Sequence, residues 1–200
     1  NTWVGSKGIE KLKKSGIEVV TGILEKEGRE LNKRFFTLHE KKRPYVILKW
    51  AQTNDSFISK FPIPQNKEEN WITCDESKIL VHKWRAEEQA ILVGTNTILT
   101  DNPELTVRLT LGKNPVRIAI DRELKLKTDS KIFNGAAETF VFTAKDEPVS
   151  GDTTYFKIDF SKNILPQLLN RLADSNISSL IVEGGTILLQ SFIKDDLWDE

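Results

Sequence analysis

The order of apolar and polar segments predicts an α/β fold with a largely parallel sheet. Short runs rich in β-branched and aromatic residues, typical of buried strands, alternate with longer segments of helical periodicity. The chain has 200 residues, 38% of them hydrophobic, which is enough to bury one good core. Gly184 and Gly185 join a strand-like run to a helix-like one, as glycines often do in such folds.

The start of the chain predicts two helices separated by one strand. Residues 8–15 have a short helical pattern that Gly16 closes, and residues 17–24 predict a strand. Residues 25–42 predict a polar helix. The apolar residues on one face of that helix are Leu31, Phe35 and Leu38.

The strands of the main sheet follow Arg43 and Pro44, which break the preceding helical pattern. They are predicted at residues 45–51, 90–94, 116–121, 139–143, 155–158 and 179–183. Helices are predicted at residues 73–88, at residues 164–173 and from Thr186 onward. Thr73 and Glu76 fit a capping box at the start of the first of these helices. A loop rich in Pro, Asn and Lys covers residues 59–70, and residues 95–105 predict a loop or a single helical turn.

The turn between the last predicted strand and helix could seat a phosphate. Gly184 and Gly185 carry no Cβ, so a ligand can approach the backbone closely. The free N–H groups in the first turn of a helix attract anions. A Gly-Gly turn is also ordinary punctuation between strand and helix, so its spacing alone leaves both interpretations open.

A group of cations follows the predicted capping box. Lys78, His82 and Arg85 have the spacing i, i+4, i+7 and therefore project from one side of the helix. They form either a solvated charged face or a phosphate clamp, in which Arg85 would supply a fork of donors. Arg108, farther along the chain, could supply a second cation to the same anion.

Lys49 lies within an apolar strand, where an unpaired ammonium group would be costly. It either reaches the surface on an edge strand or has a partner, for which Asp55 and Glu183 are candidates. Ligands of doubly wound sheets collect at the carboxyl ends of strands, which is where Glu183 lies. Asp101 precedes Asn-Pro and could serve only to set a turn, and Asp121 is assigned a structural role.

Several classes of function are disfavoured by composition. Lys plus Arg and Asp plus Glu balance at 29 each, so no overall basic field exists to hold a nucleic acid or an anionic membrane. No apolar run has the roughly 20 residues of a membrane span. A single cysteine, Cys74, suits a reducing cytoplasm. The His-x-Glu and Pro-Cys-x-x-Cys of a zinc deaminase are missing, so no metal is expected, and neither a Rossmann fingerprint nor a P-loop is present.

A series of motifs, in order along the chain, resembles the reductase domain of the RibD family, the bifunctional deaminase/reductases of riboflavin biosynthesis. These motifs are Lys49-x-Ala51-x-Thr53-x-Asp55, Trp71-Ile-Thr73, His82-x-x-Arg85, Ile91-Leu-Val-Gly94 with Thr97 and Asp101, Pro103-x-Leu105-Thr-x-Arg108, and Glu183-Gly-Gly185. We expect residues 44–200 to be the reductase domain and residues 1–43 to be the tail of a deaminase domain. Because the chain begins with Asn1, lacks methionine and ends without a capping residue, we also expect it to start and stop inside a longer protein.

The resemblance implies a dihydrofolate reductase-like fold, with a mixed, mostly parallel sheet flanked by helices. It implies NADPH-dependent reduction of 5-amino-6-(5-phosphoribosylamino)uracil to its ribitylamino product, with zinc confined to the deaminase part outside this sequence, and a homodimer. The residues that would contact the substrate, a pyrimidine ribosylamine phosphate, are Arg85, Leu105, Arg108 and Glu183. Those that would line the NADPH site are Trp71, Thr97, Asp101, Thr143, Gly185, Thr186, Ile187, Leu188, Leu189, Gln190 and Ser191.

Two residues are expected to act in catalysis. Lys49 would supply a proton for the departing ring oxygen or polarise the sugar hydroxyls, and Glu183 would stabilise the cationic imine of the opened sugar. Three positions depart from the family pattern: Thr53 replaces Ser, Ser56 replaces Gly, and Glu69 replaces a substrate-contacting Ser. Ser56 and Glu69 leave one alternative open, a non-catalytic dinucleotide-binding module. A second alternative is the single-function reductase of archaeal and fungal pathways, which acts on the diaminopyrimidinone ribosylamino phosphate, but the resemblance of residues 1–43 to a deaminase tail argues against it.

Overall fold

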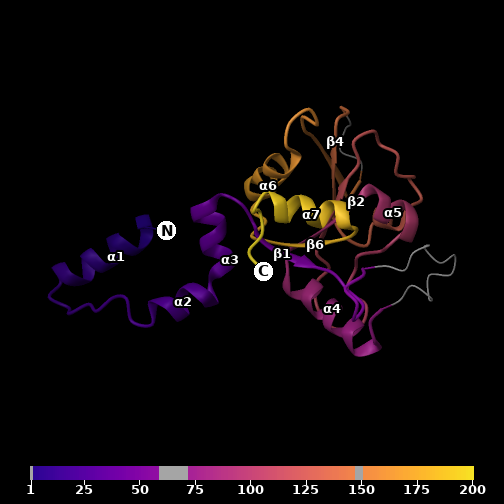
Figure 1. Ribbon diagram of the computed structural model, residues 1–200. Helices are drawn as coiled ribbons and strands as arrows, with labels where there is room; N and C mark the ends of the chain where they lie inside the picture. Colours follow the sequence, from indigo (N-terminus) through magenta and orange to yellow (C-terminus); the bar gives the residue numbers. More distant parts are fainter. Residues whose placement is uncertain (1, 59–71, 147–150) are drawn as a thin grey trace.

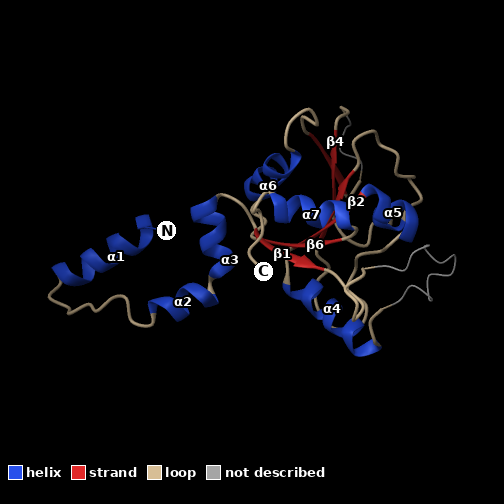
Figure 2. Ribbon diagram, viewed as in Figure 1, coloured by secondary structure: helices blue, strands red, loops and turns tan. Residues whose placement is uncertain are grey.

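A computed structural model describes residues 2–58, 72–146 and 151–200 of the protein (Figures 1 and 2). The helices are α1 Thr2–Lys14, α2 Glu25–Leu31, α3 Lys33–Phe36, α4 Asp75–Glu87, α5 Thr95–Asp101, α6 Ile164–Asp174 and α7 Thr186–Lys194. A π-helical turn, η1, spans Thr37–Lys41, and a 3₁₀ turn, η3, spans Lys131–Phe133. The strands are β1 Tyr45–Lys49, β2 Ala90–Gly94, β3 Val116–Ile120, β4 Thr139–Thr143, β5 Thr153–Lys157 and β6 Ser179–Glu183.

The six strands form one sheet in the order β1-β6-β2-β3-β4-β5, and every pair in it is parallel. From β2 the chain adds β3, β4 and β5 in one direction, then returns to place β6 between β1 and β2. The strand order therefore changes direction beside β6, where open α/β sheets form ligand sites at their carboxyl ends. The α/β class and the largely parallel sheet are as the sequence predicts.

Each face of the sheet has its own hydrophobic cluster. On one face, residues such as Leu92 and Val182 pack against α6 and α7, which contribute Leu168 and Phe192 (Figure 1). The other cluster contains Ile91, Val93, Ala119, Val141 and Ile181 from the strands, together with Ile98, Leu105 and Ile132. Because side chains alternate along a strand, Lys49 and Glu183 project on the same face as Ile181 and Ile91.

The predicted start of the chain is partly wrong. Residues 17–24 are irregular rather than a strand, because none of the described strands pairs with them and Val20 is exposed. The single helix predicted at residues 25–42 is broken at Asn32 into α2 and α3 and ends in η1. Leu31 is 84% exposed, so it does not belong to a buried face.

Ion pairs join the segment after α2 to the sheet domain, while α1 and α2 extend away from it (Figure 1). Arg34 pairs with Glu88, and Lys33 lies 3.0 Å from Glu200. Asp199 binds Arg43 and accepts a hydrogen bond of 3.0 Å from the backbone N–H of Val46. These contacts fix the entry of the chain into β1.

The remaining elements agree with the sequence except in detail. Strands β2, β4 and β6 have the predicted bounds, and Gly16 takes a positive φ of 76° after α1. The N-cap of α4 is Cys74 rather than Thr73, and its Sγ lies 3.3 Å from the Ser77 hydroxyl. The predicted loop at residues 59–70, which includes Glu69, lies outside the described residues.

Candidate active site

Two residues of opposite charge end neighbouring strands at the carboxyl edge of the sheet. Lys49 ends β1, Glu183 ends β6, and the two residues are partners in the parallel register. They share one face of the sheet on neighbouring strands, which lie about 4.8 Å apart. Lys49 is half-buried at the end of β1, which is an edge strand of the described sheet. Among the described residues no ion pair joins it to Glu183, so the partner of Lys49 stays a prediction.

Arg85 of α4 pairs with Glu183 at the same edge. Its Nη2 lies 2.9 Å from Glu183 Oε2, and the two side chains are 12% and 13% exposed. The pair makes this one bond, while the buried Arg85 Nε and Glu183 Oε1 have no partner among the described residues. A buried polar atom without a partner costs about 1–3 kcal/mol, so the pair still has hydrogen-bonding capacity to satisfy.

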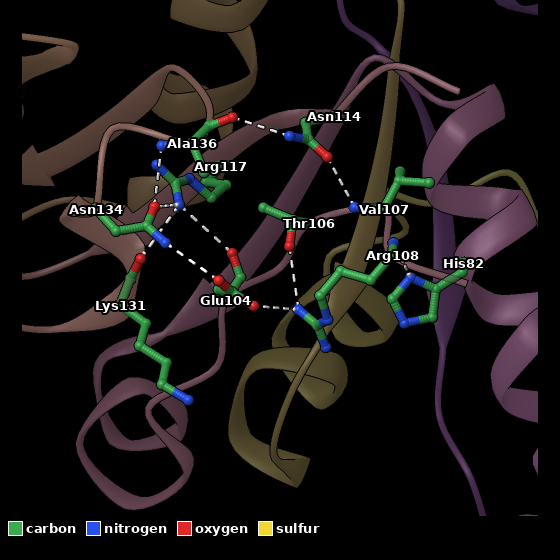
Figure 3. Close-up of polar contacts among 10 residues, drawn as sticks. All are labelled: His82, Glu104, Thr106, Val107, Arg108, Asn114, Arg117, Lys131, Asn134 and Ala136. Atoms are coloured by element: carbon green, nitrogen blue, oxygen red, sulfur yellow. Dashed lines mark hydrogen bonds and ion pairs between the residues drawn. The ribbon is translucent and has the colours of Figure 1, made fainter. Parts of the chain in front are cut away.

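The segment that contains Arg108 is attached to α4 by His82 (Figure 3). The backbone N–H of Arg108 donates to His82 Nδ1 over 3.0 Å. The Arg108 guanidinium donates through Nη1 to Glu104 Oε2 at 2.8 Å and to the Thr106 hydroxyl at 3.1 Å. Its side chain is 49% exposed, so the guanidinium remains open to solvent.

The cations of α4 do not form one solvated stripe. Lys78 pairs with Asp75 near the start of the helix, whereas His82 is buried. Burial lowers the pKa of His82, and the positive charges of Arg85 and Arg108 lower it further, against a smaller opposing effect of Glu183. His82 therefore acts as a neutral acceptor, and Arg85 and Arg108 are the cations that lie around it.

Leu105 shapes the approach to Arg108. It has a φ of 57° and is almost fully buried in the cluster on the second face of the sheet. This left-handed conformation is unusual for a residue with a branched side chain and marks a sharp turn in the backbone. The turn fixes Leu105 in the core and leads the chain outward to Arg108.

The glycine turn after β6 lies directly beside α5. Gly184 has a φ of 137°, and a Cβ added there would be 3.2 Å from Thr97 Oγ1. Gly185 is the N-cap of α7 and makes no side-chain cap, and no described residue fills the space where its Cβ would stand. Gly94 begins α5 in the same way, so two helices with uncapped N–H groups start at the ends of adjacent strands.

The other residues expected to line a cofactor are arranged unevenly. Thr186 and Ile187 are exposed in the first turn of α7, where Leu188 is half-buried. Gln190, in the next turn, is also exposed. Leu189 instead packs in the core, and the Ser191 hydroxyl donates to Ile187 O over 2.8 Å. The first turn of α7 is therefore the part of this stretch that is open to a ligand.

Three further predicted residues differ in their surroundings. Asp101 is exposed at the opposite end of α5 from the glycine turn. Thr143 is buried, and its hydroxyl donates to Arg122 O over 3.1 Å. Asp121 is structural, as predicted, because its carboxylate accepts the backbone N–H groups of Lys125 and Leu126. Trp71 lies outside the described residues.

Ser56 adopts a φ of 70°, so it does take the turn conformation that the family pattern assigns to Gly. Sequence reasoning missed the roles of Glu104, Thr106 and Asn134, whose side chains contact one another or Arg108. Glu104 stands four residues before Arg108, but this spacing is informative only in a helix, and the segment is a loop.

Among the described residues, no three His, Cys, Asp or Glu side chains gather in a way that could hold a metal ion. None of the helices in these same residues has both the length and the apolar character needed to cross a bilayer.

Comparison with known proteins places these features in a family. The family profile described as "RibD C-terminal domain" matches residues 44–200. The riboflavin biosynthesis protein RibD of Aquifex aeolicus is 40% identical over 205 residues, which cover 100% of this chain and 56% of that protein. RibD of Bacillus amyloliquefaciens is 35% identical over 209 residues, covering 100% of this chain and 55% of that protein. The chain thus spans about half the length of these curated relatives.

Solved structures of similar fold include reductases. A Thermotoga maritima crystal structure titled as a diaminohydroxyphosphoribosylaminopyrimidine deaminase/5-amino-6-(5-phosphoribosylamino)uracil reductase superimposes with a TM-score of 0.81 at 37% identity, covering 94% of this chain and 52% of that one. A riboflavin biosynthesis reductase of Saccharomyces shares the fold, with a TM-score of 0.61 at 24% identity, covering 84% and 79% of the two chains. With its parallel sheet, the glycine turn after β6 and a profile match over residues 44–200, this chain belongs to the RibD C-terminal domain family.

Proposed function

We propose that this protein reduces 5-amino-6-(5-phosphoribosylamino)uracil with NADPH, a step of riboflavin biosynthesis. The observation that supports it most is the meeting of unlike groups at one edge of the sheet. Lys49 and Glu183 end neighbouring strands there, Arg85 pairs with Glu183, and the glycine turn that leads into α7 follows Glu183 directly. The Thermotoga maritima relative is described as a 5-amino-6-(5-phosphoribosylamino)uracil reductase.

The glycine turn fits a dinucleotide phosphate. The open position over Gly185 lets an anion reach the first N–H groups of α7, which no described side chain caps. Gly184 brings Thr97 and the start of α5 to the same place. We assign the cofactor to Gly185, Thr186, Ile187 and Thr97, and a bound NADPH would supply the hydride for the reduction.

The two arginines suit the phosphate of the substrate. Both residues lie near His82, because Arg85 follows it by three residues on α4 and the backbone N–H of Arg108 donates to its Nδ1. Within the described part of the chain Arg85 retains an Nε without a partner, and the Arg108 guanidinium is half exposed. Arginine offers several donors in a planar fork, so both side chains can add phosphate oxygens to the bonds they already make.

Lys49 and Glu183 would act on the sugar ring. The Lys49 ammonium can donate a proton to the oxygen that leaves as the ring opens, and the Glu183 carboxylate can stabilise the cation left at the sugar carbon. A positioned acid typically contributes about 10² to 10⁴ in rate, whereas holding two reactants in line contributes about 7–11 kcal/mol. Alignment of the two reactants therefore contributes more to the rate than acid catalysis by Lys49.

We also propose that residues 1–43 are the tail of a deaminase domain, that any zinc belongs to that domain, and that the protein is a cytoplasmic homodimer acting on a small molecule rather than a nucleic acid. The start of the family match at residue 44 supports the domain boundary. The single cysteine and balanced charge support the compartment and the small-molecule partner.

The test mixes the purified protein with NADPH or NADH and the uracil substrate, and follows loss of the absorbance of the reduced nicotinamide. Oxidation that requires the uracil substrate supports the proposal. Oxidation with only the diaminopyrimidinone phosphate points to the single-function reductase. NADPH binding without oxidation of either substrate points to a dinucleotide-binding module.

A further inference from the structure

His82 is a buried imidazole that contacts the backbone of Arg108. Among the described residues, no hydrogen bond joins it to Lys49 or Glu183, the proposed catalytic residues. His82 lies on α4 three residues before Arg85 and is 6% exposed. Its Nδ1 accepts the backbone N–H of Arg108 over 3.0 Å (Figure 3). Because Nδ1 is the acceptor, the neutral ring has its proton on Nε2.

The segment around Arg108 depends on side chains for its position. No backbone-to-backbone hydrogen bond joins residues 103–113 to another described residue. Asn114 Oδ1 accepts from the backbone N–H of Val107 at 2.8 Å, and His82 accepts from the next N–H. Because this segment belongs to no helix or strand, these two acceptors hold the backbone at Arg108 in place.

Glu104 holds the other end of Arg108. One carboxylate oxygen accepts from Arg108 Nη1 at 2.8 Å, and the other accepts from Asn134 Nδ2 at 3.3 Å. The buried Arg117 in turn donates to Asn134 Oδ1 at 2.8 Å (Figure 3). The guanidinium of Arg108 is thus held through Glu104, while its backbone is held through His82.

We infer that His82 is a positioning residue for phosphate recognition, fixing the Arg108 backbone so that its guanidinium and that of Arg85 face one phosphate group. This inference rests on the proposed function and adds to it. A neutral imidazole can accept the N–H of Arg108, whereas a protonated ring presents a second donor to that N–H. Protonation of His82 therefore releases the Arg108 backbone and weakens the phosphate site.

The charges around His82 keep the ring neutral at neutral pH. Burial lowers its pKa below the ordinary value of 6.5, Arg85 and Arg108 lower it further, and Glu183 opposes them more weakly. Since the folded protein disfavours the proton, the hydrogen bond is fully present above the ordinary pKa and is lost as pH falls through the lowered one. Phosphate affinity should weaken in the same acidic range.

The first experiment observes the hydrogen bond directly. The Arg108 amide is followed by nuclear magnetic resonance in the wild type, in His82→Leu, which has no acceptor, and in His82→Asn, whose side-chain oxygen can replace Nδ1. We expect slow amide exchange in the wild type and His82→Asn and at least about tenfold faster exchange in His82→Leu. Equal exchange in all three proteins would overturn the inference.

The second experiment measures binding of ribose 5-phosphate by calorimetry, with ribose as the control. His82→Leu should weaken ribose 5-phosphate binding about tenfold, and His82→Asn should restore it and remove the extra loss in acid. The phosphate also titrates, with a second pKa of about 6, so the difference between wild type and His82→Asn isolates the imidazole.

The outcomes separate this inference from the proposed function. If the wild type binds ribose 5-phosphate and His82→Leu binds it equally well, the inference is wrong while the proposed function stands. If the wild type binds no ribose 5-phosphate, the phosphate site itself is refuted, and the inference with it. If His82→Leu unfolds, His82→Asn alone decides, because it must keep affinity and lose the acid sensitivity.

Discussion

Removing the charge of Glu183 should destabilise the protein more than removing the charge of Arg85. Both side chains are nearly buried, and they form one bond of 2.9 Å. Taking one partner from a buried ion pair costs about 3–5 kcal/mol because the other charge is left uncompensated. Because both side chains are slightly exposed and share a single bond, we expect Glu183→Gln to cost less than this, about 2–4 kcal/mol of unfolding free energy.

Arg85→Gln should cost less because Glu183 keeps a second cation beside it. Lys49 is its register partner on the neighbouring strand. No ion pair joins the two among the described residues, so at an effective dielectric constant of about 20 and with partial exposure we take the contribution of the Lys49 charge as about 1 kcal/mol. We therefore expect Arg85→Gln to cost about 1–3 kcal/mol, roughly 1 kcal/mol less than Glu183→Gln.

Urea unfolding followed by circular dichroism measures both free energies, provided that the slopes with urea are unchanged. The double variant should cost about 1–3 kcal/mol less than the sum of the single ones, since the partners are in contact. Lys83→Gln is a matched control on the same helix, because Lys83 is exposed and its weak pairing with Glu87 at 3.9 Å should change stability by less than about 0.5 kcal/mol. A larger loss for Arg85→Gln than for Glu183→Gln, with additive effects in the double variant, would refute this reasoning.

Three other predictions concern the glycine turn, the proposed acid and the C-terminal anchor. Gly184→Ala forces a φ of 137° on a residue with a Cβ and should cost about 1–3 kcal/mol in urea unfolding. Gly185→Ala should cost less than about 1 kcal/mol but should weaken NADPH binding in a fluorescence titration. Equal effects of the two variants would contradict this prediction. Lys49→Ala should lower the turnover number by about 10² to 10⁴ at unchanged NADPH affinity, and an unaltered turnover number would remove Lys49 from catalysis. Burial raises the pKa of Asp199, but hydrogen bonds from groups including Arg43 outweigh burial and lower the pKa overall. The carboxylate therefore stabilises the fold at pH values above its ordinary pKa, and this contribution disappears as pH falls through the lowered pKa. Asp199→Asn should therefore flatten the acid branch of a stability-against-pH curve, which an unchanged acid branch would rule out.

The sequence predicted most reliably those elements whose signals are local. Strands β2, β4 and β6 match to the residue because each is a continuous apolar run ended by a change in residue type. Residues 17–24 contain the same kinds of residue, but a strand needs a neighbour, and no described strand lies beside them. The pairing of a segment is a tertiary property that local composition does not contain.

The site was predicted in its parts but not in its contacts. Arg85 and Glu183 are 98 residues apart, and their ion pair follows from the position of β6 between β1 and β2. The helical spacing of His82 and Arg85 correctly placed them on one side of α4. It could not give the protonation state of His82, because that depends on burial and on Arg108, which arrives from another segment.

The internal carboxylates explain how this edge can hold two arginines in place before an anionic ligand arrives. Glu183 orients Arg85 and Glu104 orients Arg108, each through a single guanidinium nitrogen in the contact. A phosphate group carries a charge of about −1.5 to −2 at neutral pH and offers three acceptor oxygens. It can bond to the remaining donors without displacing either carboxylate, so little side-chain freedom is left to lose on binding. By this argument, removing Glu104 should weaken phosphate binding even though it removes a negative charge, because the loss of preorganisation outweighs the gain in positive potential at a half-exposed arginine.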